Sequence, residues 1–86
     1  MAVVALQMSS EESHAERVRR LKAEAQDYAR RHARDLVLAL GEIESYVADV
    51  LDGGEAYPVG VREAARQLAP ELAAARLNIA SILDRR

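Results

Sequence analysis

The sequence predicts an all-α protein, a helical hairpin of two long and unequal helices. Half of its 86 residues are apolar, mainly Ala, Leu and Val, with three Tyr and no Phe or Trp. Together with many Arg and Glu, this composition favours helices and lacks the enrichment in aromatic and β-branched residues that is typical of strands. Apolar residues recur at helical spacing in two segments, which are separated by one stretch rich in Gly and Pro at 52–60.

The first helix is predicted at about 10–51. Ser9 followed by Glu12 matches a capping box, and no proline interrupts the segment after it. An eleven-residue period between His32 and Ile43 relaxes the heptad pattern, and Gly41 lies inside it, where a bend is expected. The apolar positions at spacings of three and four are Val18, Leu21, Ala25, Tyr28, His32, Leu36, Leu40, Ile43, Val47 and Val50.

Residues 1–9 are assigned to a tail outside the folded domain, which spans 10–86. The segment is apolar at first but lacks a basic leader and is too short for a signal peptide or a membrane span. Met8 precedes the helix-start signal, so residues 1–7 are interpreted either as a flexible native tail or as an added extension.

The turn at 52–60 carries the most distinctive string of the chain. Gly53 and Gly54 supply the left-handed conformation that often ends a helix. Tyr57 is expected to be extended because Pro58 follows it, and Gly60 is expected to cap the next helix. The tip formed by Tyr57, Pro58 and Gly60 is read either as a docking epitope or as a closure in which Tyr57 packs over both helix ends. We favour the closure.

The second helix is predicted at about 61–85, with a kink at Pro70. The apolar positions repeat without a slip across this proline, whereas a break would normally reset their phase. The alternative places Pro70 at the start of a third helix. The positions of the repeat are Val61, Ala65, Leu68, Leu72, Ala75, Ile79 and Ile82.

The unequal helix lengths predict a homodimer. Helices of about 42 and 26 residues are roughly 63 and 39 Å long, so the second cannot cover the apolar stripe of the first. Two copies would bury this stripe as a coiled-coil-like four-helix bundle. The alternative is a compact three-helix bundle in which the first helix folds back near 32–36. The predicted self-association interface comprises Val18, Leu21, Ala25, Tyr28, His32 and Leu36.

Charge is segregated along the chain, although the net charge is only −2. Residues 14–34 hold seven Lys and Arg against three acidic residues, whereas 35–56 hold six acidic residues and no basic one. An antiparallel dimer would bring these opposite blocks together, which favours one orientation. Nucleic-acid binding through the basic block is the weaker reading, because its basic residues are spread around the helix and the acidic block is nearby. Its contact residues would be Arg17, Arg20, Arg30, Arg31 and Arg34.

No motif of the chain indicates catalysis. There is no serine or cysteine beside a positioned base, and no glycine loop that opens a helix to hold phosphate. Glu11 and His14 form one copy of a Glu-x-x-His element, but di-iron bundles use this element in pairs. We therefore expect no enzyme activity, no cofactor, no metal and no catalytic residue.

The expected function is that of a small cytoplasmic, bacterial, non-enzymatic protein that acts by self-association and protein–protein interaction, as an adaptor or regulatory subunit. The high ratio of Arg to Lys and the abundance of Ala are typical of a GC-rich bacterial genome. A dimeric nucleic-acid-binding regulator is the alternative. A third reading is a subunit whose apolar stripe is covered by a different, unidentified chain.

Overall fold

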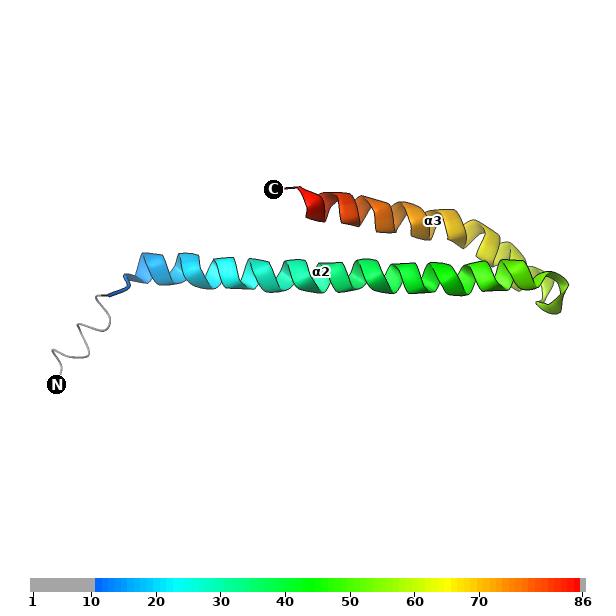
Figure 1. The fold of residues 1–86 in the computed structure, drawn as a ribbon, viewed down its shortest axis with the longest axis horizontal. Coiled ribbons are helices and arrows are strands. Elements are labelled where there is room, and N and C mark those ends of the chain that lie inside the picture. The colour runs from blue at the N-terminus through cyan, green and yellow to red at the C-terminus, as the bar shows by residue number, and fades with distance from the viewer. Residues whose placement is uncertain (1–10, 86) are drawn as a thin grey trace. The chain divides into compact units, whose positions relative to one another are not determined.

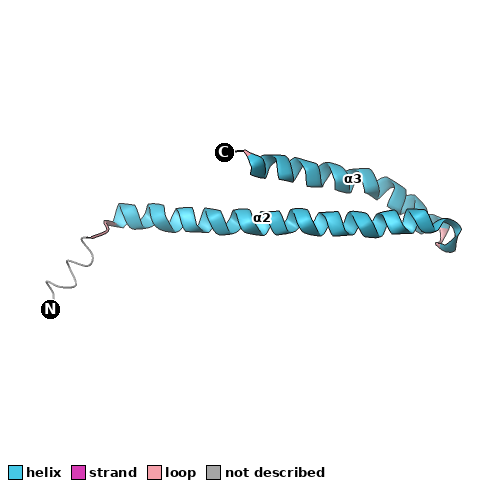
Figure 2. Ribbon diagram, viewed as in Figure 1, coloured by secondary structure: helices cyan, strands magenta, loops and turns pink. Residues whose placement is uncertain are grey.

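The structure is a computed structural model that describes residues 11–85 and contains two long α-helices. Helix α2 spans His14–Gly53, a short 3₁₀ helix η1 spans Gly54–Ala56, and helix α3 spans Val59–Asp84 (Figure 1). Within residues 11–85 there is no β-strand (Figure 2). The all-α prediction and the hairpin are therefore confirmed.

The chain divides into two units, which are described separately. The N-terminal unit covers residues 11–30 of the described chain, and the hairpin unit covers residues 31–85. Helix α2 runs without interruption through residues 32–36. The alternative three-helix bundle, which required a fold-back there, is wrong.

The first helix starts later than predicted. Residues 11–13 are not helical, and α2 begins at His14. A capping box is present, but it is formed by Ser13 and Glu16. The Glu16 N–H donates to Ser13 Oγ at 3.0 Å, and the Ser13 N–H donates to Glu16 Oε1 at 2.7 Å. The predicted partner Ser9 and the predicted tail 1–9 lie outside the described residues.

The turn between the helices is shorter than the predicted 52–60. Helix α2 continues to Gly53, and Gly54 has a φ of +57°, the left-handed conformation expected of a glycine after a helix. Tyr57 is extended, with φ −100° and ψ 146°, as predicted for a residue before proline. Gly60 is not the cap, because α3 already starts at Val59 and the Arg62 N–H donates to the Pro58 carbonyl.

Helix α3 is a single helix that contains Pro70. The alternative, a third helix starting at this proline, is therefore wrong. In the view of Figure 1, α3 changes direction between its yellow first part and its orange and red remainder. Because Pro70 lacks an N–H, the Arg66 carbonyl one turn earlier lacks its helical partner, which allows such a bend.

The two helices of the hairpin unit run antiparallel, and their contact face is offset from the predicted repeats. Val47 on α2 and Ala65 on α3, 8% and 7% exposed, are the buried residues within 11–85. Leu40, Leu72 and Ile79 are half-buried, as members of the predicted repeats should be. Other members are 41–48% exposed, namely Leu36, Ile43, Val61, Leu68 and Ile82. Each helix therefore uses one flank of its apolar stripe for the hairpin and leaves the other flank in solvent.

Candidate self-association surface

The predicted interface residues of the N-terminal unit lie on α2 and are exposed to solvent. Val18, Leu21 and Tyr28 are 64%, 50% and 69% exposed, and Ala25 between them is exposed as well. Their spacing of three or four residues places them along one side of the helix. An apolar row with this exposure is typical of a surface that binds another chain.

The remaining two predicted residues, His32 and Leu36, belong to the hairpin unit. Both are exposed, Leu36 to 47%. Neither is shielded as the neighbouring positions Ala33 and Val37 are, which are half-buried. The set predicted from the sequence is thus exposed along its whole length.

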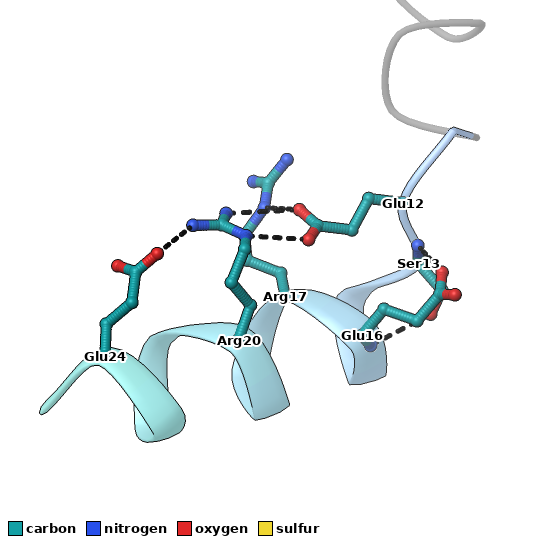
Figure 3. Close-up of polar contacts among 6 residues, drawn as sticks. All are labelled: Glu12, Ser13, Glu16, Arg17, Arg20 and Glu24. Carbon is teal, nitrogen blue, oxygen red and sulfur yellow. Dashed lines mark hydrogen bonds and ion pairs between the residues drawn. The ribbon is translucent and has the colours of Figure 1, made fainter. Parts of the chain in front are cut away.

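Polar residues form a cluster at the start of α2 (Figure 3). The Glu12 carboxylate accepts hydrogen bonds from Arg20 Nε at 2.8 Å and from Arg17 Nε at 3.4 Å. Arg20 also donates to Glu24, four residues along the helix, at 3.3 Å. Hydrogen bonds from Arg20 are the largest cause that lowers the pKa of Glu12, and the pKa of Arg20 is raised in return. The cluster tethers Glu12, which precedes the helix, to the first and second turns of α2.

This cluster bears on the predicted nucleic-acid contacts. Arg17 and Arg20 already bind carboxylates, so a phosphate would have to compete with Glu12 for them. Arg34 lies in the hairpin unit, beside a groove that also holds the acidic Asp84 of α3. The arrangement of these three arginines therefore gives no support to a phosphate-binding surface. Arg30 and Arg31 make further interactions of their own.

The tip of the hairpin is built around Tyr57 and Gly53. A Cβ atom placed on Gly53 would overlap the Tyr57 ring, so the ring occupies the space that a side chain at position 53 would need. The Tyr57 carbonyl accepts a hydrogen bond from Arg62 Nε at 3.3 Å, in the first turn of α3. Tyr57 retains 37% exposure, while Pro58 and Gly60 are exposed beside it. The Tyr57 ring therefore packs on the end of α2, and the backbone carbonyl of Tyr57 is bound by the start of α3.

One contact across the hairpin was missed by the sequence analysis. The Arg76 guanidinium on α3 donates to the Glu44 carboxylate on α2 through Nε and, at 3.4 Å, through a terminal nitrogen. The hydrogen bond to Glu44 raises the pKa of Arg76. The side chain of Glu44 is 23% exposed and that of Arg76 is 33% exposed. The side chains of Arg20 and Glu24, in the ion pairs at the start of α2, are more exposed than either. A signal existed in the sequence, because Glu44 lies one residue from the apolar position Ile43.

Metal sites and membrane-spanning helices are absent between residues 11 and 85. No group of three or more His, Cys, Asp or Glu side chains there could hold a metal ion. No helix in this range combines the length and the apolar composition needed to cross a membrane. Comparison of the chain with protein-family models, with curated proteins and with solved structures finds no match.

Proposed function

We propose that this protein is a non-enzymatic helical adaptor or regulatory subunit that acts by self-association and by binding other proteins. The observation that carries the proposal is the exposed apolar row of Val18, Leu21 and Tyr28 on α2. Apolar side chains at this spacing on a helix are the usual means by which one helix binds another. We predict that the protein forms a homodimer and that it is located in the cytoplasm.

The polar contacts of the N-terminal unit support this role. The capping box and the Glu12 cluster stabilise the start of α2, where an isolated helix would otherwise be marginal. These contacts lie between residues three to eight apart, so they need no other helix. They keep the helix formed while its apolar row stays available to a partner.

The decisive experiment is sedimentation velocity of the wild-type protein at micromolar concentration, followed by that of a variant carrying Val18→Asp and Leu21→Asp. We expect a dimer for the wild type. Two carboxylates in the row would have to be desolvated on association, so the variant should sediment as a monomer with little loss of helicity. Ala23→Asp, at an exposed position of the same helix outside the row, is the matched control and should remain dimeric.

A monomeric wild type with a compact frictional ratio would contradict the proposal. The alternative function is tested with the same samples by titrating salt into mixtures with random duplex DNA. Phosphate contacts make affinity fall steeply with salt. Strong, salt-sensitive binding that is lost on replacing Arg30, Arg31 and Arg34 would favour a nucleic-acid-binding regulator instead.

A further inference from the structure

The hairpin unit has two open faces, one on each side of the contact between α2 and α3. A groove of about 260 Å³ lies on one of them, near the turn, and all its lining residues are apolar. They come from both helices, which shows that this flank of α2 and this flank of α3 lie on the same side of the hairpin. The lining residues are Tyr46, Val47, Val50, Val61, Ala64, Ala65 and Leu68.

The same face continues away from the turn. On α2, Ile43 and Leu36 precede Val50 by seven and fourteen residues. On α3, Ala75 and Ile82 follow Leu68 by the same intervals. Residues seven apart lie almost above one another on a helix, with a drift of about 20° per heptad. We call this set the apolar face: Leu36, Ile43, Tyr46 and Val50 of α2 with Val61, Leu68, Ala75 and Ile82 of α3.

The opposite face differs in chemistry. Two further grooves open there, of about 310 and 540 Å³, and both are lined by the neighbouring residues Val37 and Leu38. Charged residues line them as well, namely Arg34, Glu44, Arg76 and Asp84. Glu44 and Arg76 neutralise each other across the hairpin. The residues that define the apolar face carry no charge, and the exposed Asp35 and Glu71 lie at its border.

We propose that the apolar face of the hairpin unit is the surface on which a second copy of this chain docks, face to face, to form a four-helix bundle. The inference deepens the proposed function, on which it rests, by assigning self-association a surface in residues 31–85. The exposed fractions are 42–48% for Leu36, Ile43, Val61 and Ile82, 41% for Leu68 and 70% for Tyr46.

The area of the apolar face suits a dimer. Its six large exposed side chains present on the order of 500 Å² of apolar surface, and alanines between them add to it, against about 800 Å² per partner in a typical stable interface. Burial of this surface would give the molecule a core that two helices cannot enclose. In the described chain, Val47 and Ala65 alone are buried.

The arrangement of the face favours a second copy over a different partner. On both helices the residues of the apolar face other than Tyr46 lie at intervals of seven, the period of helices that pack with a left-handed supercoil. A two-fold interface must be complementary to itself, and the uncharged residues of this face can meet their copies without placing like charges together. The residues of this face offer no charged group to a partner that is recognised through charge, such as nucleic acid.

Leu68→Asp tests the inference, with Leu77→Asp as its matched control. Both leucines are exposed on α3, to 41% and 58%, but Leu77 lies outside the apolar face. Analytical ultracentrifugation of the full chain should show a rise of at least tenfold in the dimer dissociation constant for Leu68→Asp and no change for Leu77→Asp. Ile82→Asp, near the end of α3, should act like Leu68→Asp, and circular dichroism confirms that each variant is folded.

A measurement on the wild-type protein covers the case in which these variants unfold. Methyl NMR spectra recorded on dilution should show shifts for Leu36, Ile43 and Leu68 and none for Leu38 and Leu77. Dissociation by Val18→Asp with an unchanged Leu68→Asp dimer would overturn the inference and leave the proposed function intact. Dissociation by Leu68→Asp with an unchanged Val18→Asp dimer would support the apolar face and show that Val18 is not in the interface. A wild-type monomer at all concentrations would overturn both.

Discussion

The two units of the chain keep their helices by different means. In the N-terminal unit the polar contacts join residues three to eight positions apart, as in the pairs Ser13 with Glu16 and Glu12 with Arg20. In the hairpin unit the ion pair between Glu44 and Arg76 joins residues 32 positions apart, and Val47 and Ala65 are buried. The first unit relies on capping and exposed ion pairs, whereas the second relies on contact between helices.

This difference sets how each unit responds to change. Exposed ion pairs and caps contribute little individually and depend on pH and salt. Buried apolar contacts contribute more and are nearly indifferent to both. Substitutions that act on one mechanism should therefore leave the unit that uses the other almost unaffected.

The largest effect is expected for Val47→Asp, compared with Val18→Asp. Val47 is 8% exposed and Val18 is 64% exposed. A carboxylate at position 47 would be held against α3, so the free energy of unfolding should fall by about 3 kcal/mol or more at every protein concentration. Urea unfolding followed by circular dichroism measures this. For Val18→Asp the urea unfolding curve should lose its dependence on protein concentration and otherwise stay unchanged. Equal losses for both variants would remove the distinction between the units.

The next largest effect is expected for Pro70→Ala. It tests whether contact with α2 keeps α3 helical although a proline lies inside it. Pro70→Ala restores an N–H donor inside α3 and removes the clash of the ring with the preceding turn. We expect the free energy of unfolding to rise by about 1 to 2 kcal/mol, less than the full cost of an interior proline because proline also restricts the unfolded chain. Thermal unfolding provides the measurement. A lower melting temperature would show that the hairpin depends on the bend.

A smaller effect is expected at the tip, from Gly53→Ala. The new methyl group would displace the Tyr57 ring, so stability should fall by about 1 kcal/mol even though alanine is the better helix former. In a Tyr57→Ala background the obstacle is gone, and the same substitution should become stabilising by about 0.5 to 1 kcal/mol.

The control for this pair is Gly60→Ala. Nothing lies within 4 Å of the Cβ position of Gly60, so its substitution should be stabilising in both backgrounds. If Gly53→Ala had the same sign with and without the tyrosine ring, the packing of Tyr57 on Gly53 would not contribute to stability.

The smallest effect is a pH dependence confined to the N-terminal unit. Hydrogen bonds from Arg20, and then from Arg17, lower the pKa of Glu12 below its ordinary value. A carboxyl group with a lowered pKa in the folded state stabilises that state fully above the ordinary pKa of about 4.3, and the contribution is lost as the pH falls through the lowered value. Helicity at the start of α2 should therefore decrease in acid before that of the hairpin unit.

Backbone chemical shifts of residues 14–24, recorded from about pH 6 to pH 2, check this expectation. Glu16 and Glu24 are further carboxylates of this unit, in contact with Ser13 and Arg20, so the comparison must be made with Glu12→Gln. This variant lacks the Glu12 contribution at every pH and should show a smaller change. A change of equal size in both proteins would show that Glu12 is not the source of the effect.

The order and type of the elements could be predicted from the sequence because they depend on local patterns. Apolar spacing located both helices, and Gly53, Gly54 and Pro58 located the turn. The predicted start of α2 was wrong because two serines satisfy the same motif. Ser9 pairs with Glu12 in sequence, but Glu12 binds Arg17 and Arg20, and Ser13 forms the box.

The faces of the helices could not be predicted from spacing alone. Each apolar stripe is wide enough to serve two contacts, and the repeat does not say which flank turns inward. Packing of α2 on α3 places Glu44 beside Arg76 and leaves Ile43 in solvent. The exposure of Val18, Leu21 and Tyr28 agrees with the prediction, whereas their role in self-association remains a prediction.

The short connection between α2 and α3 has a consequence for the order of folding. Only residues 54–58 separate the two helices, and Val47 and Ala65, which line the same groove, are fewer than twenty positions apart in the sequence. The Glu44–Arg76 pair joins residues 32 positions apart. Because closing a loop becomes costlier as it lengthens, contacts nearest the turn should form first and the rest should zip outward along the helices. Native contacts of such low sequence separation are typical of proteins that fold within milliseconds. Amide hydrogen exchange should accordingly slow from the open end of the hairpin unit toward Val47 and Ala65.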